Sequence, residues 1–177
     1  MDIKEFIDLC AGNWFSQRTD YQVETEKTES NKADLSITLI ATNDAKVSQL
    51  CLQNRIDSQL SLGGLQHSWA SSGDWGKPKQ QGSSMVVIIP DPENPQTGKI
   101  ISNAANQNLL GTYVFGNDSA LTLIFETKDK SIEERIWFAS DNLRLRTAIT
   151  KNEDGTMSTL FYSEIRKAPP KKEEATN

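Results

Sequence analysis

The sequence is poor in the side chains on which most metal sites and hydrolytic active sites depend. Its 177 residues include one histidine, His67, and two cysteines, Cys10 and Cys51, that stand far apart in the chain. One imidazole and two separated thiols are too few ligands for a structural zinc site and imply no disulfide framework. A Ser-His-Asp or Cys-His catalytic system would depend on His67 alone. We therefore expect neither a metal site nor nucleophilic catalysis of these kinds.

Excess basic charge and long apolar runs are also absent. The chain has 24 acidic and 19 basic side chains, a net charge of -5, and no Lys/Arg stripe of the kind that neutralises a phosphate backbone. No run approaches the ~18 apolar residues of a membrane span. Residues 1–5 include the charged side chains Asp2, Lys4 and Glu5, whereas a signal peptide begins with basic residues followed by an apolar stretch. We expect no nucleic acid partner, no membrane span, and a cytoplasmic protein whose two cysteines fit a reducing compartment, with a Cys10–Cys51 bridge as the alternative.

Two segments have the apolar spacing of short amphipathic helices. The chain's length and its 36% hydrophobic and 24% charged content are typical of one globular domain. In residues 2–12, apolar side chains recur at helical intervals between a capping aspartate and a glycine. A second helix is expected after Asn43-Asp44, with Val47, Leu50 and Cys51 on one face.

The remaining apolar segments are short and have the composition of strands. Residues 14–23 and 35–41 predict two strands, and the polar residues 24–34 between them are a solvated strand extension or a loop. Turn sequences then separate eight more segments, at 65–69, 85–89, 99–102, 109–115, 121–127, 132–139, 143–150 and 157–166. This order predicts a mainly β fold, a calycin- or lipocalin-like antiparallel β-barrel of about ten strands whose mouth can hold one small ligand. We assign residues 1–167 to this single domain and 168–177, with two prolines and no apolar period, to a disordered tail.

The junction between the first helix and the first strand is typical of lipocalin-like barrels. There, Gly12-Asn-Trp14 places a tryptophan where it would close one end of the barrel and pack on a basic side chain of a late strand, here Arg166. Further along, Trp69 and Trp75 flank a turn. They are either packing residues or an aromatic wall for a large conjugated ligand.

Polar residues at strand spacing suggest a second group of candidates. Ser16 and Arg18 share one face of the first strand, which is either solvated or part of a site. His67 has the same strand parity as Trp69, and it is either a structural histidine or a ligand contact.

The segment 132–149 leaves two arrangements open. On a strand, Arg144 and Arg146 share one face and the leucines between them the other, so the arginines point either to water or into a polar cavity that holds an anionic ligand. A two-residue turn at 141–142 would place Glu134 and Arg144 on opposite faces of the hairpin. A three-residue turn with Asn142 in the left-handed region would bring Glu134, Phe138, Arg144 and Arg146 to one face.

Four motifs in order carry a resemblance to a known family. They are Gly12-x-Trp14-x-Ser16-x-Arg18-Thr-x-Tyr21, the helix end Leu50–Asp57, the Ser68-Trp69 and Asp74-Trp75 pair, and Glu134-Arg-x-Trp-Phe138 followed by Asn142-Leu-Arg-Leu-Arg146. On these motifs residues 1–167 resemble the S-type (CpcS/CpeS) bilin lyases of phycobiliproteins. Ala148 departs from the pattern, since family members often carry a hydroxyl residue there, and this bears on which bilin is used.

The resemblance implies a calycin-type barrel that binds a free linear tetrapyrrole and attaches it to a specific cysteine of a phycobiliprotein α or β subunit. It also implies that the protein is located in a cyanobacterial cytosol or a plastid stroma. It implies Glu134 at the pyrrole nitrogens and Arg144 at the propionates as the catalytic pair, with no metal and no cofactor, because the acceptor supplies the thiolate. A second lyase subunit or a homodimer is a further implied partner. The implied bilin-binding residues are Trp69, Trp75, Arg18, Ser16, Phe138 and Arg146.

Two other functions stay open at this point. One is a non-catalytic carrier of a bilin or another hydrophobic molecule, in which Glu134 and Arg144 form a structural ion pair. The other is an interaction module that binds acceptor subunits without affecting a bilin.

Overall fold

The computed structural model describes residues 1–72, 79–104 and 107–168. Trp75 and residues 169–177 of the expected tail lie outside these ranges. The elements, in chain order, are α1 (Ile3–Cys10), β1 (Gly12–Gln22), β2 (Lys27–Ile40), α2 (Ala45–Gln53), the 3-10 turn η1 (Ser58–Leu60), β3 (Gly64–Ser71), β4 (Gln81–Pro90), β5 (Thr97–Ala104), β6 (Gln107–Phe115), β7 (Leu121–Glu126), β8 (Lys130–Ser140), β9 (Leu143–Asn152) and β10 (Met157–Arg166).

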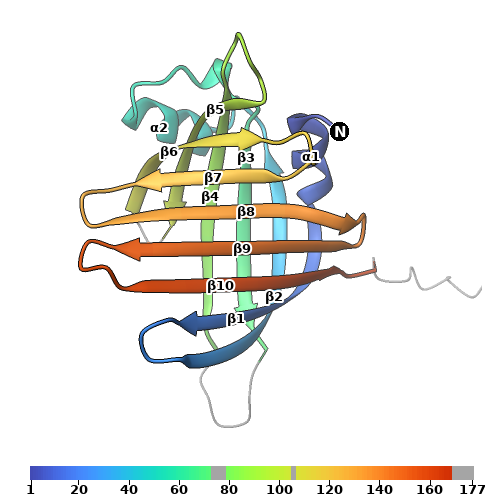
Figure 1. Ribbon diagram of the computed structural model, residues 1–177. Helices are drawn as coiled ribbons and strands as arrows, with labels where there is room; N and C mark the ends of the chain where they lie inside the picture. The colour runs from blue at the N-terminus through green and yellow to red at the C-terminus, as the bar shows by residue number, and fades with distance from the viewer. Residues whose placement is uncertain (73–78, 105–106, 169–177) are drawn as a thin grey trace, which may run out of the picture.

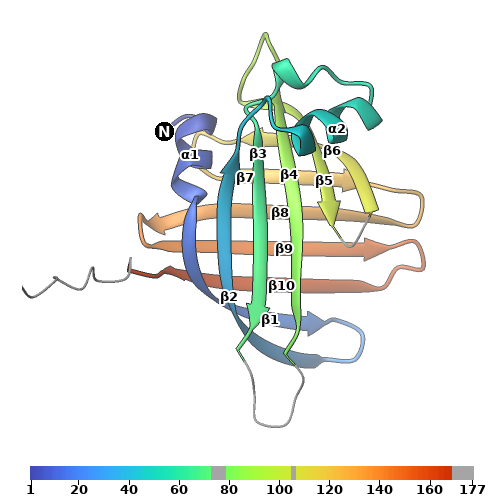
Figure 2. The ribbon, with the colours of Figure 1, turned by 180° about the vertical axis from the view of Figure 1, so that it is seen from behind.

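The strands form a closed antiparallel barrel, which confirms the predicted fold class. Each strand pairs with its neighbour in sequence, and β1 pairs with both β2 and β10 to complete the circle. The strands β2, β3 and β4 run across the direction of β8, β9 and β10, so the two groups face each other as the walls of the barrel (Figures 1 and 2). Because side chains alternate along a strand, every second residue points into the space between these walls.

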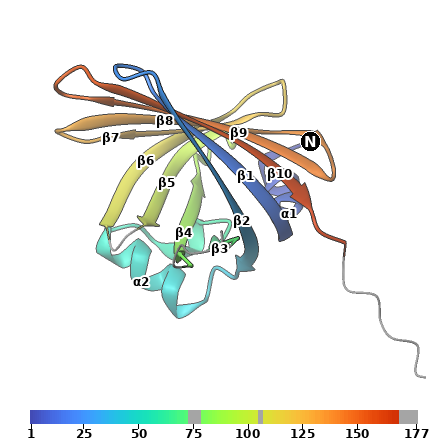
Figure 3. The same ribbon diagram turned by 90° about the horizontal axis from the view of Figure 1, so that it is seen from below.

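The polar stretch after β1 continues the sheet. Residues from Lys27 onward pair with β1 over its full length, from Gln22↔Lys27 to Gly12↔Ile37. Of the two sequence alternatives for residues 24–34, the strand extension is therefore correct, and β1 and β2 form a long hairpin whose loop lies near that of β9 and β10 (Figure 3).

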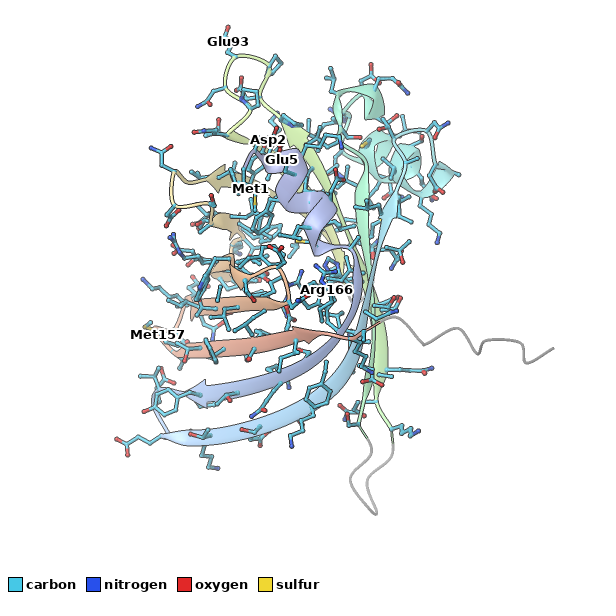
Figure 4. All side chains as sticks on the ribbon, turned by 90° about the vertical axis from the view of Figure 1, so that its right-hand side faces the viewer. Met1, Asp2, Glu5, Glu93, Met157 and Arg166 are labelled. Atoms are coloured by element: carbon cyan, nitrogen blue, oxygen red, sulfur yellow. The ribbon has the colours of Figure 1, made fainter. Side chains whose placement is uncertain are left out.

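Helix α1 closes one end of the barrel. A capping box between Asp2 and Glu5 fixes its start, and its buried face packs against Trp14 and Phe115 of the barrel core. Arg166 lies beside the last turn of α1 (Figure 4) and donates hydrogen bonds to the carbonyls of Leu9 and Ala11, at 2.6 and 2.7 Å. Its guanidinium carbon is 4.1 Å from the centroid of the Trp14 ring, so the predicted contact between these two residues is confirmed.

Helix α2 lies outside the barrel, over β4 and β5 (Figure 2). Its buried residues pack against outward-facing side chains of these strands, including Val87 and Ile101. Strand β4 therefore has apolar contacts on both faces, which explains why residues 85–89 form an uninterrupted apolar run. Among the described residues, no helix is long and apolar enough to cross a membrane.

Candidate functional site

Two neighbouring cavities lie between the barrel walls beyond the apolar core. The inner one has a volume of about 250 Å³ and the outer one about 210 Å³. They share Leu35, Trp69 and Arg146 as lining residues. Together they fall within the range of about 300–1,000 Å³ that is typical of small-molecule sites.

The inner cavity has a mixed lining of charged and apolar groups, and the lining of the outer cavity is mainly polar. Glu134, Arg144 and His67 line the inner cavity together with apolar side chains of β3, β4 and β7. Ser16 and Arg18 line the outer cavity. Of the two orientations that the sequence left open for Arg144 and Arg146, the inward one is therefore correct.

An irregularity in the β8–β9 hairpin brings Glu134 to the same face as the arginines. The turn has two residues, Asp141 and Asn142, and Ser140 pairs with Leu143. The pairing then shifts between Ser140 and Phe138, so that Phe138 faces Arg144. The face predicted for the three-residue turn is correct, but its cause is wrong: the extra residue is accommodated within β8, and Asn142 is not among the described residues with positive φ.

The most buried charged groups of the site are Arg144 and Glu164, which form an ion pair. The Arg144 Nε atom donates to Glu164 Oε2 at 2.6 Å, and the two side chains are 2% and 0% exposed. Ser16 Oγ donates to the other oxygen of Glu164 at 3.4 Å. Burial alone would raise the pKa of Glu164, but Arg144 and Arg146 outweigh it and hold this pKa below its ordinary value. Glu164 did not emerge from the sequence, and it takes the role of partner that the carrier alternative gave to Glu134.

Arg146 is the second guanidinium of the cavity, and it bridges both carboxylates. Its Nη1 atom is 2.9 Å from Glu134 Oε1 and its Nη2 atom is 3.9 Å from Glu164 Oε1. The ring of Tyr162 lies below the guanidinium, with its centroid 3.7 Å from the Arg146 Cζ atom. Burial would lower the pKa of Arg146, yet the charges of Glu134 and Glu164 raise it above its ordinary value. Arg146 is therefore a fixed cation at the boundary of the two cavities.

Three buried nitrogen atoms around the two cavities have no hydrogen-bond partner among the residues that the structure describes. They are the Nε atoms of Arg18 and Arg146 and the Nδ1 atom of His67. Burial, Arg144 and Arg146 lower the pKa of His67 to about 3, so its imidazole is neutral at ordinary pH. The site thus presents two guanidinium N–H groups and one neutral imidazole that a polar ligand can satisfy.

The predicted aromatic residues are placed at different depths. Trp69 lines both cavities, is 39% exposed, and lies over Gly82 of β4, where a Cβ atom would be 2.7 Å from the indole. Phe138 lies deeper, 5.2 Å from Phe6 and 6.1 Å from Trp14 between ring centroids, and belongs to the apolar core below the cavities. The Trp75 prediction falls outside the described residues.

These features make the site suited to a flat, anionic ligand. Trp69 offers an aromatic surface at the opening. The Nε atoms of Arg18 and Arg146, which have no partner among the described residues, can bind carboxylates. Glu134 adds a carboxylate beside the same space.

The chain was compared with known proteins. Residues 2–167 match the family model described as CpeS-like protein. The chain belongs to the CpeS-like family. Among curated members, it is 40% identical to the chromophore lyase CpcS/CpeS of Thermosynechococcus vestitus, over 94% of this chain and 93% of that protein. It is 31% identical to the phycocyanobilin lyase subunit CpcS of Picosynechococcus sp., over 93% of this chain and 86% of the relative.

A solved structure of this family has the same fold. The S-type phycobiliprotein lyase CPES from Guillardia theta superposes with a TM-score of 0.84 at 25% sequence identity, covering 96% of this chain and 94% of that one. The barrel described here therefore has the same fold as that lyase, and the family resemblance noted in the sequence is confirmed.

Proposed function

We propose that this protein is a chromophore lyase that binds a free linear tetrapyrrole and attaches it through a thioether to a cysteine of a phycobiliprotein α or β subunit. Membership of the CpeS-like family supports the proposal, because the curated relatives are named chromophore lyases. The observation that carries it is the pair of guanidinium Nε atoms, of Arg18 and Arg146, that have no partner in the described part of the chain and lie in the cavities that Glu134 and Trp69 also line. A bilin is flat, conjugated and carries two propionates, so it matches each of these groups.

The structure favours a division of roles among the arginines. Arg144 is buried and committed to Glu164, so we assign it to positioning the wall of the site rather than to direct contact with the bilin. Arg18 and Arg146 bind the propionates, with Ser16 beside them in the outer cavity. Trp69 supplies aromatic surface to the bilin, and so does Trp75, which lies outside the described residues. Phe138 packs in the apolar core next to the site.

Glu134 acts on the pyrrole nitrogens. A carboxylate near them favours the protonated, cationic tetrapyrrole, and this makes the ethylidene carbon more electrophilic. The acceptor's thiolate forms a bond to that carbon, the electron pair of the double bond moves into the conjugated system, and a proton completes the addition. Neither reactant is oxidised or reduced overall, so the proposal includes no metal and no cofactor.

The proposal extends to location and partners. The reaction belongs in the cytoplasm, or in a plastid stroma, where the acceptor subunits are assembled. Both cysteines of the chain are buried and free, which suits a reducing compartment and leaves the nucleophile to the acceptor. A second lyase subunit or a second copy of this chain is part of the same proposal.

A transfer assay tests the function. The protein is incubated with phycocyanobilin or phycoerythrobilin and apo-phycobiliprotein subunits, and the acceptor band is examined for zinc-induced fluorescence after denaturing electrophoresis. A covalent band that depends on the protein supports a lyase. A shifted bilin spectrum without a covalent band on any acceptor indicates a carrier and overturns the proposal.

Substitution of Glu134 tests its role. Glu134→Gln is expected to retain bilin binding, to shift the bound bilin's absorbance to shorter wavelength, and to slow transfer by about 10²-fold or more, the scale of general acid–base contributions. The matched control is Glu133→Gln, because Glu133 is the next residue of β8, points outward and is exposed. Equal spectra and rates in the two variants would remove Glu134 from the mechanism.

A further inference from the structure

A groove on the outside of the barrel has no role in the function proposed above. It lies between α2 and the outer surface of the neighbouring strands, which continue past the helix (Figure 2), and its volume is about 440 Å³. Its lining is rich in carboxamide side chains, namely Gln49 and Gln53 of α2, Gln66 of β3, Asn103 of β5 and Asn108 of β6. These residues define what is called the amide groove below.

The amide groove differs from the two cavities in its charge and in its lack of aromatic surface. Of the described residues that line it, Lys46 alone is charged, and none is acidic or aromatic. A flat ligand with two carboxylates would find one cation here, whereas the cavities offer Arg18, Arg146 and the indole of Trp69. The groove is therefore suited to a different ligand from the bilin.

Hydrogen bonds hold several of these carboxamides in place and leave complementary groups available. Asn103 Nδ2 donates to Asn108 Oδ1 at 2.8 Å, and Asn108 Nδ2 donates to Gln53 Oε1 at 2.6 Å. On β3, Gln66 Nε2 donates to the carbonyl of Ser84 at 2.9 Å. These bonds leave Asn103 Oδ1 and Gln66 Oε1 as acceptors and the amide hydrogens of Gln53 as donors. The groove thus offers both halves of a hydrogen-bond pair at fixed positions.

This chemistry matches a polypeptide. A peptide group has one N–H donor and one C=O acceptor, so carboxamides can pair with the backbone of a bound segment whatever its side chains. Leu50 and Met85 add apolar surface to the same groove. A centre with little charge is also usual for the surfaces at which proteins meet.

The position of the groove connects it to the bilin site. Asn103 lines the groove on the outer face of β5, whereas the next residue, Ala104, lines the inner cavity and is exposed. Ser84 of β4, which pairs with Ala104, lines both spaces. Because β5 ends at Ala104, the inner cavity reaches the surface at this point, about one residue of strand, or 3.3 Å, beyond the groove.

We propose that the amide groove docks the segment of the acceptor subunit that carries the cysteine to be modified. The inference rests on the proposed function, because it takes the bilin to lie in the cavities beside Glu134 and Arg146. A segment held in the groove brings its thiolate to the opening at Ala104, where the reactive end of the bilin is presented. The bond-forming step is the addition described above, and the groove supplies only the position of the nucleophile. Selection of the cysteine is therefore a property of the groove, and affinity for the bilin is a property of the cavities.

Separate measurements of the two affinities test this division. The groove variant is Gln49→Ala/Gln53→Ala, because both side chains are exposed and alanine is compatible with the helix. Its affinity for apo-phycocyanin α or β subunits, with the acceptor cysteine replaced by serine, is expected to fall about tenfold or more in calorimetric titration, as two hydrogen bonds are lost. Its affinity for phycocyanobilin, measured by absorbance, is expected to equal that of the wild type.

The matched control is Gln59→Ala/Gln96→Ala. Both glutamines are exposed and neither lines the groove, so this variant should bind the subunits and the bilin as the wild type does. Far-UV circular dichroism and the melting temperature establish that both variants are folded.

A crosslink from the groove gives a second measurement that removes no contact of the barrel strands. Because Cys10 and Cys51 are buried, Gln49→Cys introduces one accessible thiol for a benzophenone maleimide. Irradiation with the same subunit should link this position to the peptide around the substituted cysteine, as identified by mass spectrometry. The equally exposed Gln96→Cys should give no such link.

Three results would overturn the docking proposal. They are equal acceptor affinities of the groove variant and its control, a loss of bilin affinity as large as the loss of acceptor affinity, and crosslinks that map away from the cysteine-bearing segment. In each case, covalent transfer by the wild type leaves the lyase function standing. Absence of transfer by the wild type is detected in the transfer assay and overturns the proposed function instead.

Discussion

Replacing Glu164 by glutamine should destabilise the protein strongly, although glutamine has nearly the same shape. Glu164 is fully buried and offsets the charge of Arg144, which is itself only 2% exposed, with a 2.6 Å hydrogen bond between them. Removing one partner of a buried pair leaves the other charge uncompensated and typically costs about 3–5 kcal/mol. Arg146 lies 3.9 Å from the same carboxylate and would also lose part of its balance. We expect the free energy of unfolding to fall by at least about 3 kcal/mol and the melting temperature by roughly 6–12 °C.

Urea denaturation followed by circular dichroism measures this change, with Asp118→Asn as the control. Asp118 pairs with Arg135 on the surface, where the side chains are 57% and 45% exposed, so its loss should cost less than about 1 kcal/mol. The double variant Arg144→Met/Glu164→Gln removes the cation as well and should recover part of the loss. A change below about 1 kcal/mol for Glu164→Gln would refute the view that this ion pair is a buried, mutually dependent unit.

The pH dependence of stability gives the same prediction an independent test. The pKa of Glu164 is lower in the folded protein than in the unfolded chain, where an ordinary glutamate has a pKa of about 4.3. Below that value the unfolded chain takes up a proton that the native carboxylate does not, so stability falls as the pH drops further. This stabilising contribution is fully present above about pH 5. Glu164→Gln should therefore flatten the acid limb of the stability curve, whereas Asp118→Asn should leave it nearly unchanged.

Two further predictions concern the walls of the cavities. The pKa of His67, about 3 in the folded protein against about 6.5 in the unfolded chain, means that protonation favours unfolding as the pH falls below about 6.5. His67→Gln should remove up to about 1.4 kcal/mol per pH unit of the slope between pH 6.5 and 5, and an unchanged slope in urea denaturation would contradict a buried neutral imidazole. At the opening, Gly82→Ala should displace the indole of Trp69, which lies within 2.9 Å of the added Cβ atom, and weaken bilin binding by roughly tenfold. Spectral titration with bilin measures this effect, and equal affinity of Gly82→Ala and the outward-facing control Ser83→Ala would show that the indole position does not matter.

The helices and most strand positions followed from local sequence because their causes are local. A capping aspartate and apolar residues at helical spacing were sufficient for α1 and α2. Turn sequences between short apolar runs were sufficient for the eight strands from β3 to β10. The contact between Trp14 and Arg166 was predictable from the helix–strand junction together with the likeness to lipocalin-like barrels.

The arrangement of the charged residues could not be obtained in the same way, because it depends on register and on which side of a strand is inside. Whether Glu134 meets Arg146 is decided by one extra residue in β8 near Ala139, for which the sequence offers no turn signal. Glu164 was missed because the usual alternation, with apolar side chains inward and polar ones outward, is reversed in this part of β10. Its apolar residues Phe161 and Ile165 would be assigned to the core by pattern alone, yet they point outward.

This inverted alternation determines both the charged inner wall of the site and the apolar outer surface of β9 and β10. On β9 and β10 the interior positions hold Arg144, Arg146 and Glu164, and the outward positions between them are apolar or neutral. These charges can lie inside because they pair with one another and with Glu134. The outward apolar side chains Phe161 and Ile165 remain about half exposed. With Arg18 and Lys32, the cavities are lined by four cations against two carboxylates, so they attract an anion in a chain whose net charge is negative. A strand pair that buried its leucines instead would have a more ordinary core, but it would have neither a cationic wall for propionates nor an uncovered apolar surface. Substitutions that reverse the alternation of β9 or β10 should therefore weaken ligand binding, whereas Phe161→Glu/Ile165→Glu, on the outward side and outside both cavities, should leave it unchanged.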